Sequence, residues 1–232
     1  MTKLTTPREG PDGPGEAAER RRPLSRDQVL RAAMRLADEG GLEAVSMRKL
    51  GRVLRVEAMS LYKHVGSKDD ILDGIADLVT GDFEVPSPGD QWKAAIRRSV
   101  ISAHQVLLGH PWASSLIESR RNAGPARLRY LDAVVGVLSG AGLPMPIVLR
   151  GVMALDSHTY GFVLQEQAWP FDSDGAPEAA ATFAEELPEN EFRNLAAAAE
   201  MVATTPGGAM VDFEFGLDLI LDGLERLLDS AD

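Results

Sequence analysis

The chain has 232 residues, of which 44% are hydrophobic and 25% charged, a balance typical of a globular protein with a sizeable core. It contains no cysteine, which excludes disulfide frameworks, thiolate metal sites and cysteine nucleophiles. No apolar run approaches the roughly 20 residues that span a bilayer, and the charged, proline-containing start does not resemble a signal peptide. We therefore expect a cytoplasmic protein with no membrane partner.

The net charge of −11 is divided unevenly along the chain. Residues 1–68 hold 14 Lys and Arg against nine Asp and Glu, a net charge of +5, whereas residues 69–232 hold 10 against 26, a net charge of −16. A basic N-terminal part on an acidic remainder is the asymmetry expected when only the first part meets phosphates. Chance clustering on a solvated surface gives the same counts, so the charge pattern needs support from motifs.

The first helical pattern follows a polar tail. Residues 1–22 are rich in Gly, Pro, Glu and Arg and are predicted to be disordered. Helical periodicity begins after Ser25, a good N-cap, and stops at Gly40-Gly41.

Three further helices are predicted before the first linker. A short helix starts at Ser46, a break follows at Arg55-Val56, and a second short segment covers residues 57–64. Ser67 caps a longer helix over residues 68–81.

The remainder of the chain is predicted to be helical as well. The proline-containing stretch 85–89 is the strongest linker signal, and a long polar loop is expected from Pro170 to about Pro188. An amphipathic helix over about 209–229 ends the chain. Because strand-like alternation is nowhere sustained, the sequence predicts an all-α fold. We expect a three-helix head, residues 23–70, joined to a larger helical body, residues 71–232.

Two short helices joined by a tight turn and braced by a longer helix form a helix-turn-helix. The segment 57–64 has the composition of a recognition helix, because Leu61 and Val65 can face the supporting helices while polar side chains face outward. Tyr62 can donate to a phosphate, and Lys68 adds charge at a helix N-terminus that already favours an anion.

Several stretches of the head match a known pattern: Ala32-Ala33, Gly40-Gly41-Leu42, Ser46 to Leu50, Met59-Ser60-Leu61-Tyr62-Lys63-His64-Val65 and Ser67 to Leu72. In these residues Ser25 to Val79 resembles the DNA-binding domain of the TetR family of repressors. The resemblance implies that the DNA-contacting residues are Ser46, Met47, Arg48, Ser60, Tyr62, Lys63, His64 and Lys68. The chain departs from the pattern at Met47, where a hydroxyl residue is common, and at Lys63, where an aromatic is frequent, so the operator sequence does not transfer.

The resemblance continues in the body. Tyr130 to Gly142, Gly161 to Gln167 and Phe213 to Glu225 are similar to the C-terminal domain of the tetracycline repressor subgroup. This implies that helices about 147–168 and 209–229 pack against their partner copies as a four-helix bundle. We expect a homodimer because one recognition helix reads too few bases to find an operator.

Three glycines inside helices bear on this interface. Each of Gly161, Gly216 and Gly223 lowers helix stability by roughly 1 kcal/mol compared with Ala. Glycine at these positions is consistent with a close approach of two helix backbones. Packing within one chain is the alternative explanation.

A ligand pocket needs apolar walls and a few convergent polar groups. The candidate side chains are His104, His110, Trp112, Leu116, Met153, His158, Tyr160, Phe162, Gln165 and Trp169. Each is also compatible with ordinary packing. We expect an apolar, ring-containing compound between the segment His104–Trp112 and the helix that carries Phe162 and Gln165.

No metal or cofactor is expected. The chain lacks cysteine and a closely spaced histidine pair, and the full magnesium ligand set of the tetracycline repressor is not found in it.

Together these patterns predict a ligand-responsive transcriptional repressor that binds palindromic operator DNA as a homodimer and is released by a small-molecule inducer. The alternative is a DNA-binding regulator, repressor or activator, without small-molecule input. An enzyme is disfavoured, because no glycine-rich phosphate loop follows a strand and no Ser/His/Asp order stands out.

Overall fold

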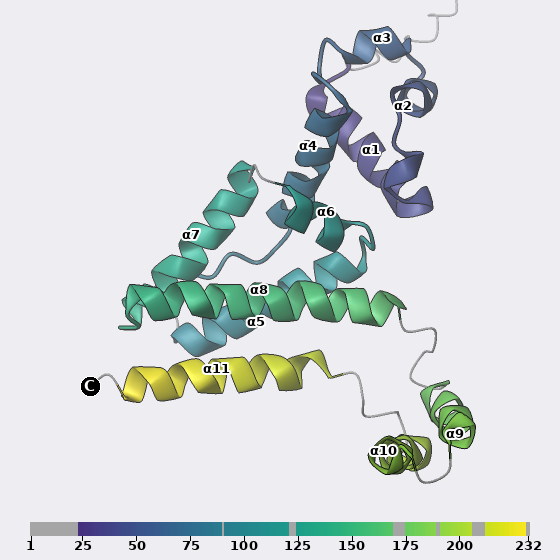
Figure 1. Ribbon diagram of the computed structural model, residues 1–232. Helices are drawn as coiled ribbons and strands as arrows, with labels where there is room; N and C mark the ends of the chain where they lie inside the picture. Colours follow the sequence, from purple (N-terminus) through teal and green to yellow (C-terminus); the bar gives the residue numbers. More distant parts are fainter. Residues whose placement is uncertain are drawn as a thin grey trace, which may run out of the picture.

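The computed structural model describes residues 23–89, 91–120, 124–168, 175–188, 191–205 and 212–230, and these residues form an all-α fold, as predicted (Figure 1). The predicted tail, residues 1–22, and the pocket candidate Trp169 lie outside the described residues. Within the described part, no helix combines the length and the apolar character needed to cross a bilayer.

The head consists of α1 (Arg26–Gly40), a 3₁₀ helix (Leu42–Ala44), α2 (Met47–Leu54), α3 (Ala58–Leu61) and the start of α4 (Lys68–Gly81). Ser25 and Ser67 cap α1 and α4 as predicted, and Ser46, the predicted first residue of the second helix, is the N-cap of α2; each accepts a backbone N–H with its side-chain oxygen. At α1 the Gln28 side chain also returns a hydrogen bond to the Ser25 backbone, which completes a capping box.

The recognition segment is only partly helical, which corrects the prediction of a helix over 57–64. α3 ends at Leu61, and residues 62–64 form a tight turn. The N–H groups of Lys63 and His64 bond to carbonyls three residues back, at 3.3 and 2.8 Å, which tightens the chain beyond the α-helical pitch. Leu61 and Val65 are buried, as predicted.

The turn between α2 and α3 requires a close approach of two backbone segments. Arg55 ends α2 in the left-handed conformation, with φ of +56°. A Cβ at Gly51 would lie 2.8 Å from the Val56 carbonyl oxygen, so a larger residue there would push the turn away from α2.

The body contains α5 (Trp92–Leu108), α6 (Ala113–Ser119), α7 (Pro125–Gly140), α8 (Met145–Ala168), α9 (Ala176–Glu186), α10 (Arg193–Thr204) and α11 (Phe213–Asp229). α8 begins two residues before the predicted 147, because a proline in the first turn, Pro146, loses no helical hydrogen bond. α11 begins at Phe213 rather than about 209, since Asp212 caps it by accepting the Phe215 N–H at 3.0 Å.

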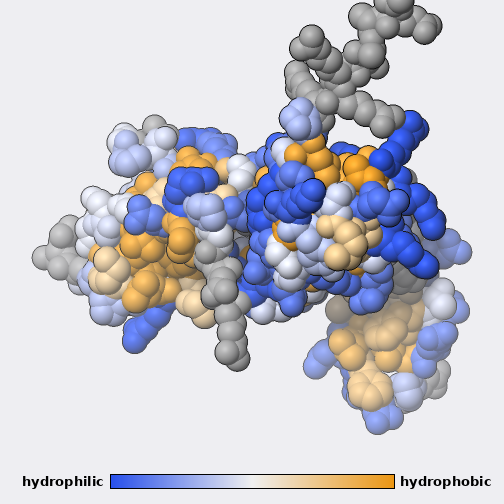
Figure 2. Space-filling model, turned by 90° about the horizontal axis from the view of Figure 1, so that it is seen from above, coloured by the Kyte–Doolittle hydropathy of each residue, from blue (hydrophilic) through white to orange (hydrophobic). Residues whose placement is uncertain are grey.

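The long polar loop predicted from Pro170 to about Pro188 is wrong over Ala176–Glu186, which forms α9. This stretch is rich in Ala and carries a proline in its first turn, both of which favour a helix. α9 and α10 pack on each other as a pair that projects at one end of α8 and α11 (Figure 1), and this pair is the fainter lobe with hydrophobic surface at the lower right of Figure 2.

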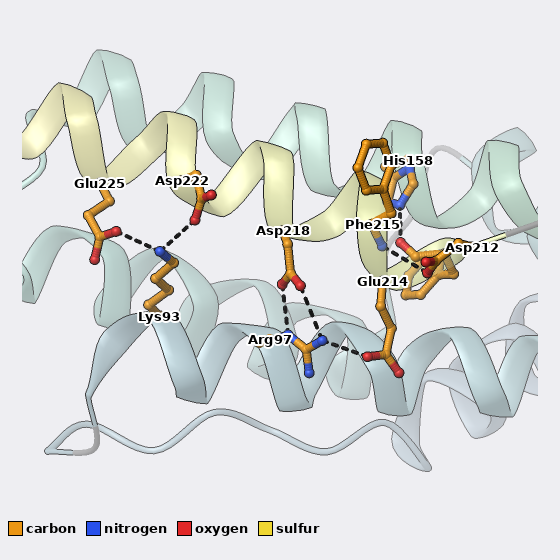
Figure 3. Close-up of polar contacts among 10 residues, drawn as sticks. Lys93, Arg97, His158, Asp212, Glu214, Phe215, Asp218, Asp222 and Glu225 are labelled. Carbon is orange, nitrogen blue, oxygen red and sulfur yellow. Dashed lines mark hydrogen bonds and ion pairs between the residues drawn. The ribbon is translucent and has the colours of Figure 1, made fainter.

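α4 connects the two parts of the molecule. It packs against α1 in the head and against α5, α6 and α7 in the body (Figure 1). α8 and α11 run side by side along the opposite edge, and both pack on α5. Ion pairs fasten α5 to α11: Lys93 bridges Asp222 and Glu225, and Arg97 bridges Glu214 and Asp218, all at 2.6–2.7 Å (Figure 3).

Candidate nucleic-acid interface and ligand cavity

The outward face of the recognition segment carries most of the predicted contact residues. Tyr62 is 48% exposed, Lys63 is exposed, and His64 is half-buried in the same turn. Lys68 lies exposed at the first position of α4, where the helix N-terminus favours an anion. The Ser60 hydroxyl donates a hydrogen bond of 2.7 Å to the Glu57 carbonyl, so its oxygen is held at the start of α3.

The residues predicted on α2 divide by environment. Arg48 is exposed, whereas Met47 packs its side chain partly against the core. Ser46 accepts the Lys49 N–H at 3.3 Å and is therefore the structural cap of α2. Of these three, Arg48 is the freest to reach a phosphate.

Sequence reasoning gave no contact role to Met59, which is 76% exposed on α3. An apolar side chain presented from a recognition helix can contact the methyl group of thymine. The signal in the sequence is the position of Met59 two residues before the inward-facing Leu61, which places it on the opposite side of a helix.

A bidentate ion pair fixes the recognition segment to the rest of the head. Both oxygens of Asp70 accept from the Arg26 guanidinium, at 2.6 and 2.7 Å, and Asp70 also accepts the Gly66 N–H at 2.8 Å. The hydrogen bonds from Arg26 and Gly66 lower the pKa of Asp70 below its usual range, against the opposing effect of burial. The turn that precedes α4 is therefore clamped to the start of α1.

The head also has an open groove of about 650 Å³ between α1 and the end of α2. Its lining includes Arg31, Arg35 and Arg55, above an apolar floor of Leu24 and Leu54. Of these arginines, Arg31 is paired with Asp27 at 2.9 Å. The groove adds positive charge beside the recognition segment.

Polar contacts join the head to the turn between α5 and α6. Asp38, on α1, lies 2.7 Å from His110 Nδ1 and accepts the Trp112 indole N–H at 2.7 Å. The two candidates His110 and Trp112 are therefore at the junction of head and body.

A row of aspartates on one face of α4 forms a second junction. Arg120, after α6, contacts Asp69 at 3.2 Å and Asp73 at 3.1 Å. Asp77 accepts the backbone N–H groups of Ala126 and Arg127, at 2.8 and 3.2 Å, so that it caps the start of α7. These contacts tie the end of α6 and the start of α7 to α4.

The pocket candidates His104, His158 and Phe162 are brought together, through a residue that was not a candidate. Both imidazoles stack on the ring of Phe213, with centroids 3.9 and 4.8 Å away, and Phe162 meets Phe213 edge-on at 5.4 Å. His104 Nε2 lies 2.6 Å from Glu166, and His158 Nε2 donates to the Phe213 carbonyl at 2.9 Å. The cluster fastens the start of α11 to α5 and α8.

The remaining pocket candidates do not converge. Met153 is 67% exposed and Gln165 is exposed on α8, whereas Leu116 is buried in α6. A Cβ at Gly216 would collide with the His158 ring, so packing within one chain already explains why this position is a glycine.

An internal cavity lies instead between α5, α7 and α8. Its volume is about 10 Å³, room for about one water molecule, and Tyr160 is the only pocket candidate among its described lining residues. The walls are Phe83, Val100, Ala103, Tyr130, Leu131, Val134, Val152, Leu155, Asp156, Thr159 and Tyr160. Sequence periodicity marks most of these as core residues and gives no sign that they surround a cavity.

Burial shifts the titration of the polar groups at this cavity. It raises the pKa of Asp156 to about 6, with Arg127 opposing and Glu118 adding to the shift. Burial also raises the pKa of Tyr130 to about 12, and its hydroxyl lies 3.3 Å from that of Ser99. Among the described residues, no cluster of three or more His, Asp or Glu is arranged to hold a metal ion.

Apolar side chains lie exposed along α8 and α11. On α8, Met145, Leu149 and Met153 are 48–67% exposed at four-residue spacing; on α11, Phe215 and Leu219 are 64% and 56% exposed. Phe215 points away from α5, whereas Glu214 and Asp218 point toward it (Figure 3). α11 therefore has an outward apolar face in addition to the face that packs in its own core.

Comparison with known proteins places both parts of the chain in one family. Residues 29–75 match the description "Bacterial regulatory proteins, tetR family", and residues 85–228 match "Tetracyclin repressor-like, C-terminal domain".

Individual relatives agree. A transcriptional regulator of the helix-turn-helix type from Saccharopolyspora erythraea is 37% identical over 63% of this chain and 62% of its own length. The class A tetracycline repressor from Escherichia coli is 31% identical over 88% of this chain and 91% of its own length.

Among solved structures, apo ActR from Streptomyces coelicolor has a TM-score of 0.77 at 26% identity, covering 91% of this chain and all of its own. ActR in complex with actinorhodin has a TM-score of 0.74 at 27% identity, covering 88% of this chain and 98% of its own.

Proposed function

The chain belongs to the TetR family of bacterial transcriptional regulators, and from that premise we propose that it is a cytoplasmic repressor that binds palindromic operator DNA as a homodimer and releases it when a small molecule enters the body. The observation that carries the proposal is the placement of α4. This helix presents Lys68 beside the recognition segment at one end and is held by Arg120 and the start of α7 at the other.

DNA binding is supported by the exposed face of the head. Donors and positive charge for phosphates come from Tyr62, Lys63, Arg48 and Lys68, and the Arg26–Asp70 clamp holds the start of α4 against the start of α1. The acidic body would be repelled by DNA, which favours binding through the head alone.

Dimerisation is supported by the apolar faces of α8 and α11. These helices lie side by side (Figure 1), and each carries large exposed apolar side chains, which water solvates poorly. A Cβ at Gly161 would meet nothing within 4 Å, and one at Gly223 would meet only the flexible Arg226 side chain at 3.9 Å, so a partner helix can approach both backbones. Two copies joined here would present two recognition segments to a palindromic site.

Release by a ligand is supported by the contacts that cross between body and head. A ligand shifts an equilibrium only if it binds the two states with different affinity. The cavity between α5, α7 and α8 borders α7, and Asp77 of α4 caps the first turn of α7. ActR, whose fold is similar, is known in complex with actinorhodin. For the present chain we place the inducer in this cavity, rather than between Trp112 and Phe162.

The experiment has two stages. A binding-site selection followed by fluorescence anisotropy should return a palindrome bound by one dimer; selection of a single half-site or no enrichment would contradict the proposal. A compound library is then screened for compounds that stabilise the protein and lower operator affinity. Tight operator binding with no such compound would favour the alternative, a regulator without small-molecule input. No residue arrangement described above favours an enzyme.

A further inference from the structure

The internal cavity combines aromatic walls with one charged group. Phe83, Tyr130 and Tyr160 line it, and the first two rings meet edge-on with centroids 5.3 Å apart. Asp156, on α8, is the only charged residue in the described lining. The other wall residues are aliphatic, apart from Thr159, whose hydroxyl donates to the Leu155 carbonyl at 2.7 Å.

The Asp156 carboxylate has no directly contacting partner in the part of the chain that the structure describes. Among the described residues it makes no hydrogen bond and no ion pair. Arg127, the basic residue whose charge it feels, donates instead to the Ile117 carbonyl at 2.8 Å and to Glu118 at 3.3 Å. Neither carboxylate oxygen is fully buried, so both are open to water or to a ligand that enters the cavity.

The charges around the cavity leave it negative. Asp156 and Glu118 contribute two negative charges and Arg127 one positive charge, while the phenols of Tyr130 and Tyr160 stay neutral because burial raises their pKa values. Aromatic rings add to the attraction for a cation, because their faces carry partial negative charge. An anionic compound would meet repulsion and would find no basic side chain in the described lining.

We propose that the cavity binds an apolar, ring-containing cation, such as a protonated amine, with Asp156 as its counter-ion and Tyr130, Tyr160 and Phe83 around its apolar part. This inference rests on the proposed function, since it names the chemical class of the inducer for the same site. With a volume of about 10 Å³, the cavity must open for such a compound to enter, which requires α7 and α8 to separate. Asp77 ties the start of α7 to α4, so this opening would move the head.

The test uses three probes that share a ring and differ in charge: 1-naphthylmethylamine, 1-naphthalenemethanol and 1-naphthoate. Thermal stabilisation and affinity of the full-length protein are measured for each at neutral pH. We expect the amine to bind at least tenfold more tightly than the alcohol, and the naphthoate to bind most weakly. Asp156→Asn should abolish the difference between amine and alcohol. Asp132→Asn, which neutralises an exposed aspartate on α7, should retain it.

The proposal is overturned if the alcohol or the naphthoate binds as tightly as the amine, if none of the three binds, or if Asp156→Asn keeps the preference. Operator binding by the wild-type protein is measured in parallel without probes. If the protein binds its operator and a neutral or anionic compound releases it, the proposed function stands and only the proposed positive charge of the inducer is wrong. If the protein does not bind operator DNA, the proposed function is wrong, whatever the order in which the three probes bind.

Discussion

The indole N–H of Trp112 donates a hydrogen bond of 2.7 Å to Asp38, which joins the turn between α5 and α6 to the first helix of the head. His110 contacts the same carboxylate oxygen at 2.7 Å. A single aspartate therefore gathers two side chains from the body, 72 and 74 residues away in sequence. This contact is a direct route by which a change in the body can reach the DNA-binding surface.

Replacing Trp112 by Phe should weaken that route and leave the ring in place. We expect the change in operator affinity caused by an inducer to shrink about fivefold, because one hydrogen bond to a charged group, worth on the order of 1 kcal/mol, is lost between body and head. Anisotropy titrations with and without inducer measure this. Trp92→Phe, which removes an indole at the start of α5, is the matched control. Equal responses in the two variants and the wild type would rule out this role of Trp112.

Lys68→Ala should weaken binding to all DNA sequences by a similar factor. The side chain is exposed at the start of α4, where it can neutralise a phosphate without reading a base. The slope of log affinity against log salt should fall by about one, because one fewer counterion is released. Titrations between 50 and 300 mM salt measure the slope, with Arg129→Ala on α7 as the control. A loss confined to the operator sequence would assign Lys68 to base recognition.

Ser60→Ala should alter which base is preferred at one position of the operator. In the free protein the hydroxyl donates to the Glu57 carbonyl, yet its lone pairs can accept from a base edge in the major groove. We expect the preference at that position to relax by about fivefold, on the order of 1 kcal/mol. Site selection with both proteins measures it. Identical selected motifs would mean that Ser60 only closes the first turn of α3.

Leu219→Lys should separate the dimer. This side chain is 56% exposed on the outward face of α11, where a lysine would bring charge into an apolar helix-helix contact. Sedimentation at micromolar concentration should show mostly monomer, together with a loss of operator binding of at least a hundredfold. Leu128→Lys alters an equally exposed leucine on α7, at 57% exposure, and should remain dimeric. A dimeric Leu219→Lys protein would place the interface elsewhere.

Asp156→Asn should stabilise the free protein at high pH. The pKa of Asp156 is raised by burial to about 6, above the value near 3.8 of an exposed aspartate. The folded state therefore binds its proton more tightly than the unfolded state, and this contribution to stability is lost as pH rises through about 6. The variant should exceed the wild type by on the order of 2 kcal/mol at pH 8, and by little near pH 4. Urea unfolding at both pH values measures the difference; a constant difference would contradict the burial of this carboxylate.

Local sequence was sufficient for much of the head. The caps at Ser25 and Ser67 and the buried pair Leu61 and Val65 were predicted correctly, because capping and helical periodicity depend on residues within about four positions. The all-α class followed for the same reason. The end of α3 at Leu61 was not predicted, because the same residues can form either an α-helix or a turn with i→i+3 hydrogen bonds.

The contacts that connect the parts of the molecule were decided only by the tertiary structure. Asp38 meets Trp112, Asp77 caps α7, and Phe213 gathers His104 and His158, and in each case the partners are tens of residues apart. The sequence by itself determined the all-α class, most of the helices and that the basic charge lies in the head, but it did not reveal α9. It could not determine which buried side chains surround a cavity, because the pattern that marks a residue as apolar and inward is the same whether its neighbours fill the space or leave it open.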